Sequence, residues 1–250
     1  MRAIGFLGGS FDPVHHGHVG LAQTALDQLG LEHVRFIPAA QSWQKGAPGA
    51  SGTQRADMLY LAVATAAYPR FCVDERELTR GGVSYTIDTA RELRAEFGAD
   101  TALCLLLGAD QFLNLPTWRD WRALLDLVNL AVAGRPGYQH NPQHWPAEIV
   151  GACASRVVYP PGAACTKAFG AVHLIDMAPA DISATRLRAW LAQRAAAGAH
   201  PAAGHQAGAA AQNNTAAENT PAALADAAEA GMLPAAVLDY IDCHQLYSGA

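Results

Sequence analysis

The sequence predicts an α/β fold, with a doubly wound parallel sheet followed by a C-terminal helical part. Three observations carry this prediction. Short apolar runs alternate with amphipathic segments along most of the chain, the first run (3–7) ends at a pair of glycines, and the run 101–107 is hydrophobic enough to lie at the centre of a sheet. Alternation of this kind requires crossover connections, which make the strands parallel.

The first unit of the pattern is a strand, a helix and a second strand. Residues 3–7 are typical of a buried parallel strand. Helical spacing over 17–29, followed by Gly30, predicts a helix that ends there. A second strand is expected over 33–37. Such a βαβ unit favours a right-handed crossover and parallel pairing.

The remaining elements continue the alternation. Ser84 is expected to cap a helix that runs to Phe97 and ends at Gly98, and Ser183 to open a helix through Leu191. Three further helices are expected: one over 53–68, a second that ends with residues 124–128, and a third that follows Pro234. The apolar side of the third helix would carry Val237, Leu238, Ile241 and Leu246. Further strands are expected over 71–74, 130–133 and 172–175.

Residues 195–230 break this pattern. They are rich in Ala, with Gly, Asn, Gln and Pro interspersed, and lack the large apolar residues that offset ordering entropy. We interpret most of the segment as a mobile surface insertion within one domain, 1–250, with 222–230 as a candidate short helix. Because it falls between two C-terminal helices, we expect its removal to leave turnover unchanged.

Composition narrows the class of protein. The chain has 250 residues, 51% of them hydrophobic, which suffices for one sizeable core. Its net charge is −5 and no block of Lys or Arg stands out, which argues against nucleic acid as a partner but not against a small anionic ligand. Five scattered cysteines argue against a disulfide framework.

No signal-peptide pattern and no apolar run long enough for a bilayer is visible, so we expect a cytoplasmic protein with no membrane partner. Whether the chain forms a homo-oligomer is left open by the sequence.

The run from Gly8 to His18 is the strongest chemical signal. Glycines after a first strand let the backbone approach a ligand, and the following helix start offers N–H groups to phosphate. His15 and His18 flank that start and can donate hydrogen bonds to phosphate oxygens. The run is neither GxGxxG nor the P-loop, which needs a lysine. A zinc site and a chemically silent surface are the alternatives, but no Cys or Glu accompanies the histidines.

Two polar groups are expected at the same end of the sheet. Ser183 or Thr185 at a helix start offers donors, and Arg188 can reach back to the same anion. The alternative is a plain N-cap followed by a solvated basic face. Asp110 follows the central strand, so it would lie over the same crevice as His18, or else serve only as a helix cap.

A third group combines a helix start with an indole. Ser84-Tyr85-Thr86 together with Pro116-Thr117-Trp118 would suit a flat, anionic aromatic ring. The alternative is that Trp118 is a core residue.

Taken together and in this order, these motifs resemble the bacterial nicotinate-nucleotide adenylyltransferases. The superfamily of nucleotidylyltransferases to which that family belongs is marked by (H/T)xGH and ISSTxxR motifs. Here they read His15-His16-Gly17-His18 and Ile182-Ser183-Ala184-Thr185-Arg186-Leu187-Arg188. The resemblance extends to 84–86, 108–110, 116–118, Gly134-Arg135-Pro136-Gly137 and the tail from Leu233 to Tyr247. It implies a Rossmann-like fold.

The resemblance also implies a reaction and a set of site residues. ATP and nicotinate mononucleotide would give nicotinate adenine dinucleotide and pyrophosphate, a step of NAD synthesis. The implied catalytic residues are His15, His18 and Arg188. Implied ATP-binding residues are Gly9, Ser10, Phe11, His15, His18, Gly108, Asp110, Arg135, Ser183, Thr185 and Arg188, and implied nicotinate-nucleotide-binding residues are Lys45, Tyr85, Thr86 and Trp118. Mg²⁺ would be bound mainly through the ATP phosphates, without a protein metal site.

Two features depart from the family pattern. Family members often carry Pro-Pro-His-Lys or Pro-Pro-His-Arg after the second strand, where this chain has Ser42-Trp43-Gln44-Lys45, and the 195–230 segment is not part of the usual pattern. Alternatives are an adenylyltransferase acting on nicotinamide mononucleotide or phosphopantetheine, and a non-catalytic nucleotide sensor. The 84–86 and 116–118 motifs favour the nicotinate substrate, whereas His16 has no assigned role.

Overall fold

The computed structural model describes residues 1–42, 48–66, 69–134, 144–160, 162–177, 182–197 and 231–248. Within these ranges a seven-stranded sheet has the order β4-β2-β1-β6-β7-β9-β8, and every pairing is parallel. The strands are β1 (Ala3–Gly9), β2 (His33–Pro38), β4 (Phe71–Val73), β6 (Ala102–Gly108), β7 (Asn129–Ala133), β8 (Val157–Val158) and β9 (Val172–Ile175). The expected parallel sheet is confirmed, with β6 at its centre.

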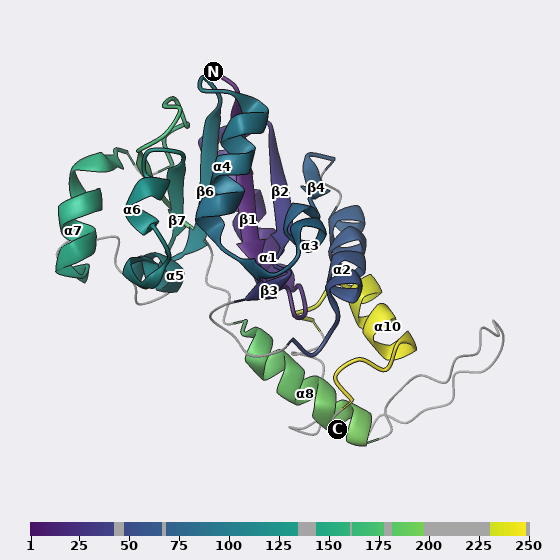
Figure 1. Cartoon of the computed structure of the whole chain (residues 1–250). Coiled ribbons are helices and arrows are strands. Elements are labelled where there is room, and N and C mark those ends of the chain that lie inside the picture. The colour runs from purple at the N-terminus through teal and green to yellow at the C-terminus, as the bar shows by residue number, and fades with distance from the viewer. Residues whose placement is uncertain are drawn as a thin grey trace.

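Helices cover both faces of this sheet (Figure 1). One face carries α1 (His16–Leu29) and α2 (Gly52–Thr65), and α10 (Ala235–Cys243) packs against α2. Helix α8 (Ala184–Ala196) lies below the sheet in Figure 1, and its Leu187 and Leu191 belong to the same hydrophobic cluster. The other face carries α4 (Thr86–Phe97), α5 (Ala109–Leu113), α6 (Trp121–Leu124) and α7 (Ala147–Cys153). Shorter elements are α3 (Arg76–Arg80), the 3₁₀ turns η1 (Leu115–Thr117) and η3 (Ala154–Arg156), and a two-stranded sheet of β3 (Gln41–Ser42) and β5 (Val83–Ser84).

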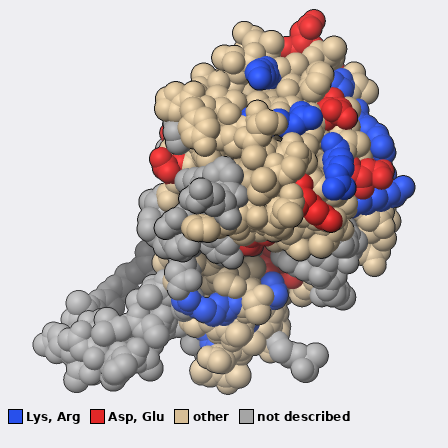
Figure 2. Space-filling model, turned by 90° about the vertical axis from the view of Figure 1, so that its left-hand side faces the viewer, with Lys and Arg blue, Asp and Glu red and all other residues tan. Residues whose placement is uncertain are grey.

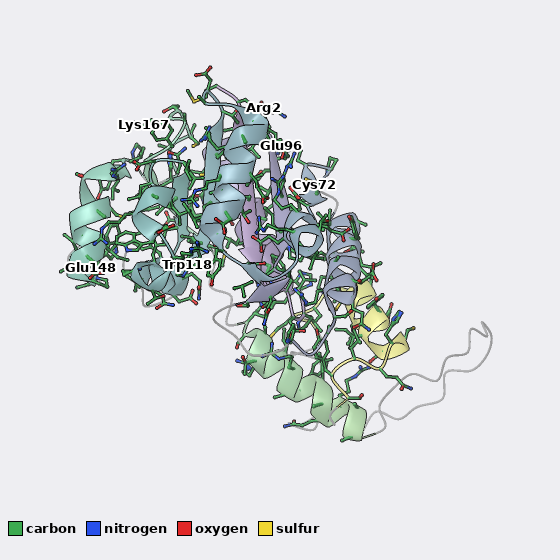
Figure 3. All side chains as sticks on the ribbon, in the orientation of Figure 1. Arg2, Cys72, Glu96, Trp118, Glu148 and Lys167 are labelled. Atoms are coloured by element: carbon green, nitrogen blue, oxygen red, sulfur yellow. The ribbon has the colours of Figure 1, made fainter. Side chains whose placement is uncertain are left out.

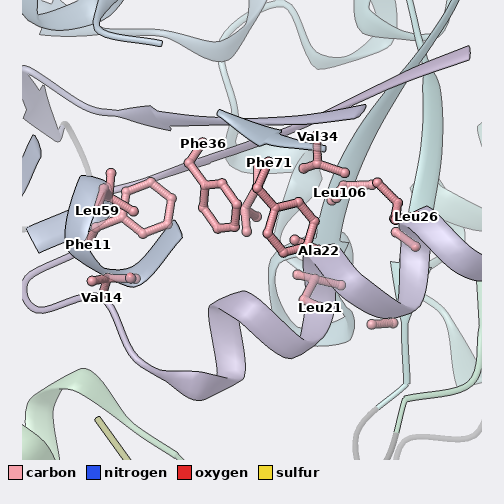
Figure 4. Packing of buried hydrophobic residues seen from close by; sticks show 14 of the residues in the cluster. Phe11, Val14, Leu21, Ala22, Leu26, Val34, Phe36, Leu59, Phe71 and Leu106 are labelled. Atoms are coloured by element: carbon pink, nitrogen blue, oxygen red, sulfur yellow. The ribbon is translucent and has the colours of Figure 1, made fainter. Parts of the chain in front are cut away.

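The central strands explain why the core has two halves. Successive side chains of a strand point to opposite faces of the sheet. A strand that is apolar throughout and buried on both faces therefore packs against the helices on both sides. In β6, Cys104 and Leu106 pack with the α1 face, whereas Leu103, Leu105 and Leu107 pack with the α4 face. Figure 4 shows the α1 half, in which aromatic rings from β2 and β4 meet Leu21 and Ala22 of α1.

Three expected boundaries were wrong. Ser84 does not cap α4, because it lies in β5 and Tyr85 is the N-cap. The helix expected to close at 124–128 is the single turn 121–124, which gives way to turns before β7. The last helix ends at Cys243, so Leu246 packs into the core from beyond it. The small elements α3, α5, α7, β3, β5 and β8 were not predicted.

The other boundaries agree closely with expectation. Helix α2 runs over 52–65 and α8 begins after its N-cap Ser183. The expected short helix 222–230, with the rest of 198–230, lies outside the described residues.

Candidate active site

The candidate site lies at the topological switch point of the sheet, where the strand order reverses. Strands β1 and β6 are neighbours, but the chain continues from β1 to β2 on one side and from β6 to β7 on the other. Ligands bind in the crevice that such a switch point opens beyond the carboxyl ends of the strands. Helix α1 follows β1 at this edge and α5 follows β6, so His18 and Asp110 come to the same edge, as expected. It is the lower edge in Figure 1.

The two predicted histidines form one unit at the start of α1. His15 is the N-cap, and its ring stacks on that of His18 with centroids 3.7 Å apart and an interplanar angle of 22°. The backbone N–H of His15 donates to Nδ1 of His18 (3.3 Å), and Phe11 presents its ring edge to His18 at 5.0 Å. The stack therefore holds both imidazoles at the start of the helix, where the backbone N–H of His18 donates to the carbonyl of His15 (2.9 Å).

The glycine between them makes this stack sterically compatible with the helix. A Cβ atom on Gly17 would lie 3.0 Å from Nδ1 of His15. His16, by contrast, is exposed, and its backbone N–H donates to the carbonyl of Met232 (2.9 Å). The structure thus gives the HxGH pattern a packing reason and leaves the His16 side chain facing solvent.

The backbone before the histidines is shaped around Phe11. This residue adopts φ = 49°, in the left-handed region that is uncommon for side chains other than glycine. Its ring is buried in the core, and a Cβ on Gly9 would lie 3.2 Å from that ring. Phe11 is therefore buried, whereas Gly9 and Ser10 remain partly exposed at the end of β1.

Asp12 organises this loop, although the sequence suggested only a turn there. Its carboxylate is buried and accepts hydrogen bonds from the backbone N–H of Gly49 (2.9 Å) and Ala50 (3.1 Å) and from the hydroxyl of Tyr247 (2.7 Å). A buried carboxylate is stable only when donors compensate its desolvation. Asp12 therefore ties the β1–α1 loop both to the loop before α2 and to the C-terminal tail.

Arg55 also connects the β1–α1 loop to neighbouring segments, and the sequence did not predict this role. It is 1% exposed, and its guanidinium donates to the carbonyl oxygens of Ser10 (2.7 Å), Ala50 (3.3 Å) and Ala40 (3.4 Å). Burial lowers the pKa of Arg55, and the charge of Asp12 acts in the opposite direction. The signal available in the sequence was an arginine at an apolar position of a predicted helix.

Helix α8 brings the second predicted phosphate motif to the first. Ser183 is the N-cap residue of α8 and is exposed, as is Thr185, the second residue of the helix. Arg188 donates through Nη1 to the backbone carbonyl of Asp12 (2.7 Å) and through Nη2 to Oγ1 of Thr185 (3.4 Å). Residues that are 176 positions apart are thus joined at the carboxyl edge of the sheet.

The β6 end contributes a compact turn. Gly108 is the N-cap of α5 and Asp110 lies in its first turn. A Cβ on Gly108 would lie only 2.7 Å from Oδ1 of Asp110, so the small residue lets the carboxylate fold back over the strand end.

The aromatic group lies on the α4 side of the same edge. Tyr85 caps α4, Thr86 is its first residue, and the Arg119 guanidinium lies 4.8 Å from the centre of the Tyr85 ring. Trp118, labelled in Figure 3, is partly buried, and its Nε1 has no hydrogen-bond partner among the described residues. The indole therefore packs against the core cluster with part of its surface exposed, and its Nε1 is buried.

Ser84, the last residue of β5, fixes the position of the strand that immediately precedes Tyr85 and Thr86. Its Oγ accepts from the backbone N–H of Ala40 (3.0 Å), and its hydroxyl donates to the carboxylate of Glu77. Burial raises the pKa of Glu77, while hydrogen bonds from Thr89 and Ser84 counteract that rise. The serine of the Ser-Tyr-Thr motif thus connects β5 to Ala40 and Glu77.

Some predicted positions are not part of this description. Lys45 and Gln44 in the loop after β3, and Arg135 after β7, lie outside the described residues. Within the described ranges no cluster of three or more His, Cys, Asp or Glu side chains could hold a metal ion, and no helix is long and apolar enough to cross a membrane. The five cysteines are free thiols. On the face shown in Figure 2, acidic and basic side chains are interspersed.

Comparison with known proteins connects this geometry to a family. The family model described as cytidylyltransferase-like matches residues 6–189. A probable nicotinate-nucleotide adenylyltransferase of Chromobacterium violaceum is 45% identical over 190 residues, which cover 76% of this chain and 87% of the relative. One from Herminiimonas arsenicoxydans is 35% identical over 246 residues, covering 98% and 97%, so that match runs through 195–230.

Solved structures agree in fold. The nicotinic acid mononucleotide adenylyltransferase of Plasmodium falciparum, solved in complex with NaAD, superposes with a TM-score of 0.67 over 99% of this chain and 98% of that one, at 14% identity. The same protein in complex with APC gives a TM-score of 0.62 at 13% identity.

Proposed function

Because this chain belongs to the nicotinate-nucleotide adenylyltransferases, we propose that it transfers the adenylyl group of ATP to nicotinate mononucleotide at the carboxyl edge of its sheet. The products are nicotinate adenine dinucleotide and pyrophosphate, and the step belongs to NAD synthesis. The observation that carries the assignment of residues is the hydrogen bond from Arg188 to the Asp12 carbonyl (2.7 Å). It joins the two phosphate motifs, which the sequence alone leaves far apart.

The reaction requires a nucleophile, an electrophile and a leaving group in line. A phosphate oxygen of nicotinate mononucleotide attacks the α-phosphorus of ATP, and the bond from that phosphorus to the oxygen bridging to the β-phosphate breaks. Pyrophosphate leaves with the electron pair. The attacking oxygen is already anionic, so no general base is needed and catalysis rests on positioning and on neutralising charge.

The chain's own groups match those two tasks. His18 accepts a hydrogen bond at Nδ1, so its Nε2 carries the proton and serves as a donor. We assign His15, His18 and the positive end of the α1 dipole to the α-phosphate, and Ser183, Thr185 and Arg188 to the β- and γ-phosphates. Preorganised donors of this kind favour the transition state because they need no reorientation as charge develops.

The remaining predicted residues divide between the two nucleosides. The backbone of residues 9–11, together with Gly108, Asp110 and Arg135, is assigned to the ATP side. Tyr85, Thr86, Trp118 and Lys45 are assigned to the nicotinate nucleotide, with the α4 helix start and the Trp118 face suiting a flat ring that carries a carboxylate.

Magnesium enters this scheme as part of the ATP substrate. The carboxylate of Asp12 is already taken by three donors, so it is poorly suited to a cation. An ion coordinated by triphosphate oxygens and water needs few protein ligands. When bound, it neutralises phosphate charge beside Arg188.

We further infer that residues 1–250 act as one catalytic domain in the cytoplasm.

The assay that tests the function measures pyrophosphate release from MgATP, with nicotinate mononucleotide and nicotinamide mononucleotide offered separately. Release with the acid and much slower release with the amide is the expected result. Release with neither substrate would refute the enzymatic assignment, and equal rates would refute the preference for the acid.

A further inference from the structure

We propose that Tyr247 of the C-terminal tail is a positioning residue for Arg188, acting through the buried carboxylate of Asp12. This inference rests on the proposed function, because it assumes that Arg188 binds the ATP phosphates. It assigns a part in the reaction to a residue that follows the last helix and that no motif of the active site includes.

The tail is held firmly where it reaches the site. Beyond the end of α10 at Cys243, the side chain of Leu246 is buried in the core, and the next residue turns its hydroxyl to Oδ1 of Asp12 (2.7 Å). Burial and the adjacent carboxylate raise the pKa of Tyr247, so its hydroxyl remains a proton donor at all ordinary pH values.

The ring of Tyr247 also packs closely against a glycine. A Cβ on Gly49 would lie 2.8 Å from its Cδ1 and Cε1 atoms, so the ring lies against the bare backbone of that glycine. The N–H of Gly49 donates at the same time to Oδ2 of Asp12. The tail and the loop before α2 therefore enclose the carboxylate together.

This enclosure decides how Arg188 pairs with Asp12. Oδ1 is satisfied by Tyr247 and Ala50, and Oδ2 by Gly49. Arg188 consequently bonds to the backbone carbonyl at 2.7 Å, while its Nη1 remains 3.9 Å from Oδ2. A free carboxylate would instead attract the guanidinium into a two-pronged ion pair, which would consume the donors that a phosphate needs.

Removal of the hydroxyl should therefore act on Arg188. In Tyr247→Phe, Oδ1 loses a donor, and the guanidinium gains a competing partner in place of the phosphates. We expect the KM for ATP to rise about tenfold, the size expected for one hydrogen bond to a charged group, with the KM for nicotinate mononucleotide changing less than about twofold.

A double-mutant cycle separates positioning from general support of the fold. Tyr247→Phe is compared in the wild-type and Arg188→Ala backgrounds, with thermal unfolding recorded for all four proteins. If Tyr247 acts through Arg188, its replacement has almost no further effect once the arginine is gone. Equal effects in both backgrounds, or equal increases in both KM values, would overturn the proposal.

The matched control is Tyr240→Phe. That hydroxyl also joins the C-terminal region to a carboxylate, Asp57 of α2 (2.8 Å), but it has no connection to Arg188. We expect its kinetic constants to match the wild type. A wild-type enzyme that releases no pyrophosphate would refute the proposed function, whereas an active wild type with an additive cycle refutes only the role of Tyr247.

Discussion

The imidazoles of His15 and His18 are stacked with centroids 3.7 Å apart, and the backbone N–H of His15 donates to Nδ1 of His18. The second contact fixes which nitrogen of His18 is a donor, and the first prevents either ring from rotating alone. The helix cap and the proposed phosphate clamp are thus the same structure, so the local fold already orients the chemistry.

Replacement of His18 by Ala removes the donor that we propose acts on the transferring phosphate. We expect turnover to fall by about 100-fold or more, as is typical when one transition-state donor is lost. The KM for ATP should change much less. The control is His16→Ala, whose side chain is exposed and makes no contact within the site, and it should retain near wild-type turnover. A drop of only a few-fold for His18→Ala would mean that this residue is structural.

Substitution of Gly17 by Ala tests whether the stack itself matters. The added methyl would press on His15 from 3.0 Å, so the ring must shift or the helix start must deform. Turnover should fall at least tenfold, while the folded state remains intact by circular dichroism.

Gly20→Ala is the matched control for this change. Gly20 lies one turn further along α1, and a Cβ there would meet nothing within 4 Å. Because Ala has the higher helix propensity, this variant should be about 0.5–1 kcal/mol more stable than the wild type and fully active. Equal activity of the two variants would show that the stack is dispensable.

Trp118 is predicted to act on one substrate only. In Trp118→Leu the indole face and its Nε1 donor are lost together, so the KM for nicotinate mononucleotide should rise about tenfold while that for ATP stays within about twofold. The control, Trp190→Phe, alters an indole of α8 that packs against the other hydrophobic cluster. An increase in both KM values for Trp118→Leu would instead indicate that the edge of the sheet had been disturbed.

The alternation of apolar runs and amphipathic helices predicted the sheet and its centre because burial on both faces leaves a continuous apolar strand such as 102–108. It did not reveal α3 or α5, which are single turns with too few residues for a period to be read. The alternation also did not predict the N-cap of α4. Ser84 is a residue type that often caps helices, but here its hydroxyl donates to the carboxylate of Glu77.

Local motifs predicted the histidines and Arg188 as site residues, and the structure brings them to the same edge of the sheet, whereas the residues that contact their loop were not predicted. Asp12 precedes a proline and has the form of a turn residue, and Arg55 is a charged residue at an apolar position of a predicted helix, a position that does not reveal its partners. Their partners are 37 and 45 positions away in the sequence, at Gly49 and Ser10, so only the fold shows that they are buried and fully bonded. Long-range polar contacts of this kind leave no periodic trace.

Stability should depend on pH through Asp74, at a distance from the site. Burial raises the pKa of Asp74, but hydrogen bonds from Arg76 (2.6 Å) and Arg35 (2.9 Å) outweigh it, and the pKa lies below its ordinary value. A depressed pKa means that the group stabilises the fold above its unfolded-state pKa of about 3.9, and that this contribution is lost as pH falls through the folded value.

Asp74→Asn should therefore cost about 1–3 kcal/mol of unfolding free energy at pH 7, because it leaves two partly buried guanidinium groups with a weaker partner. Urea unfolding at pH 7 and near pH 3 checks this, and the gap between variant and wild type should narrow at the lower pH. Asp88→Asn, which removes one exposed i,i+3 pair with Arg91, should cost under about 0.5 kcal/mol. A gap for Asp74→Asn that is the same at both pH values would show that its charge is not what stabilises the fold.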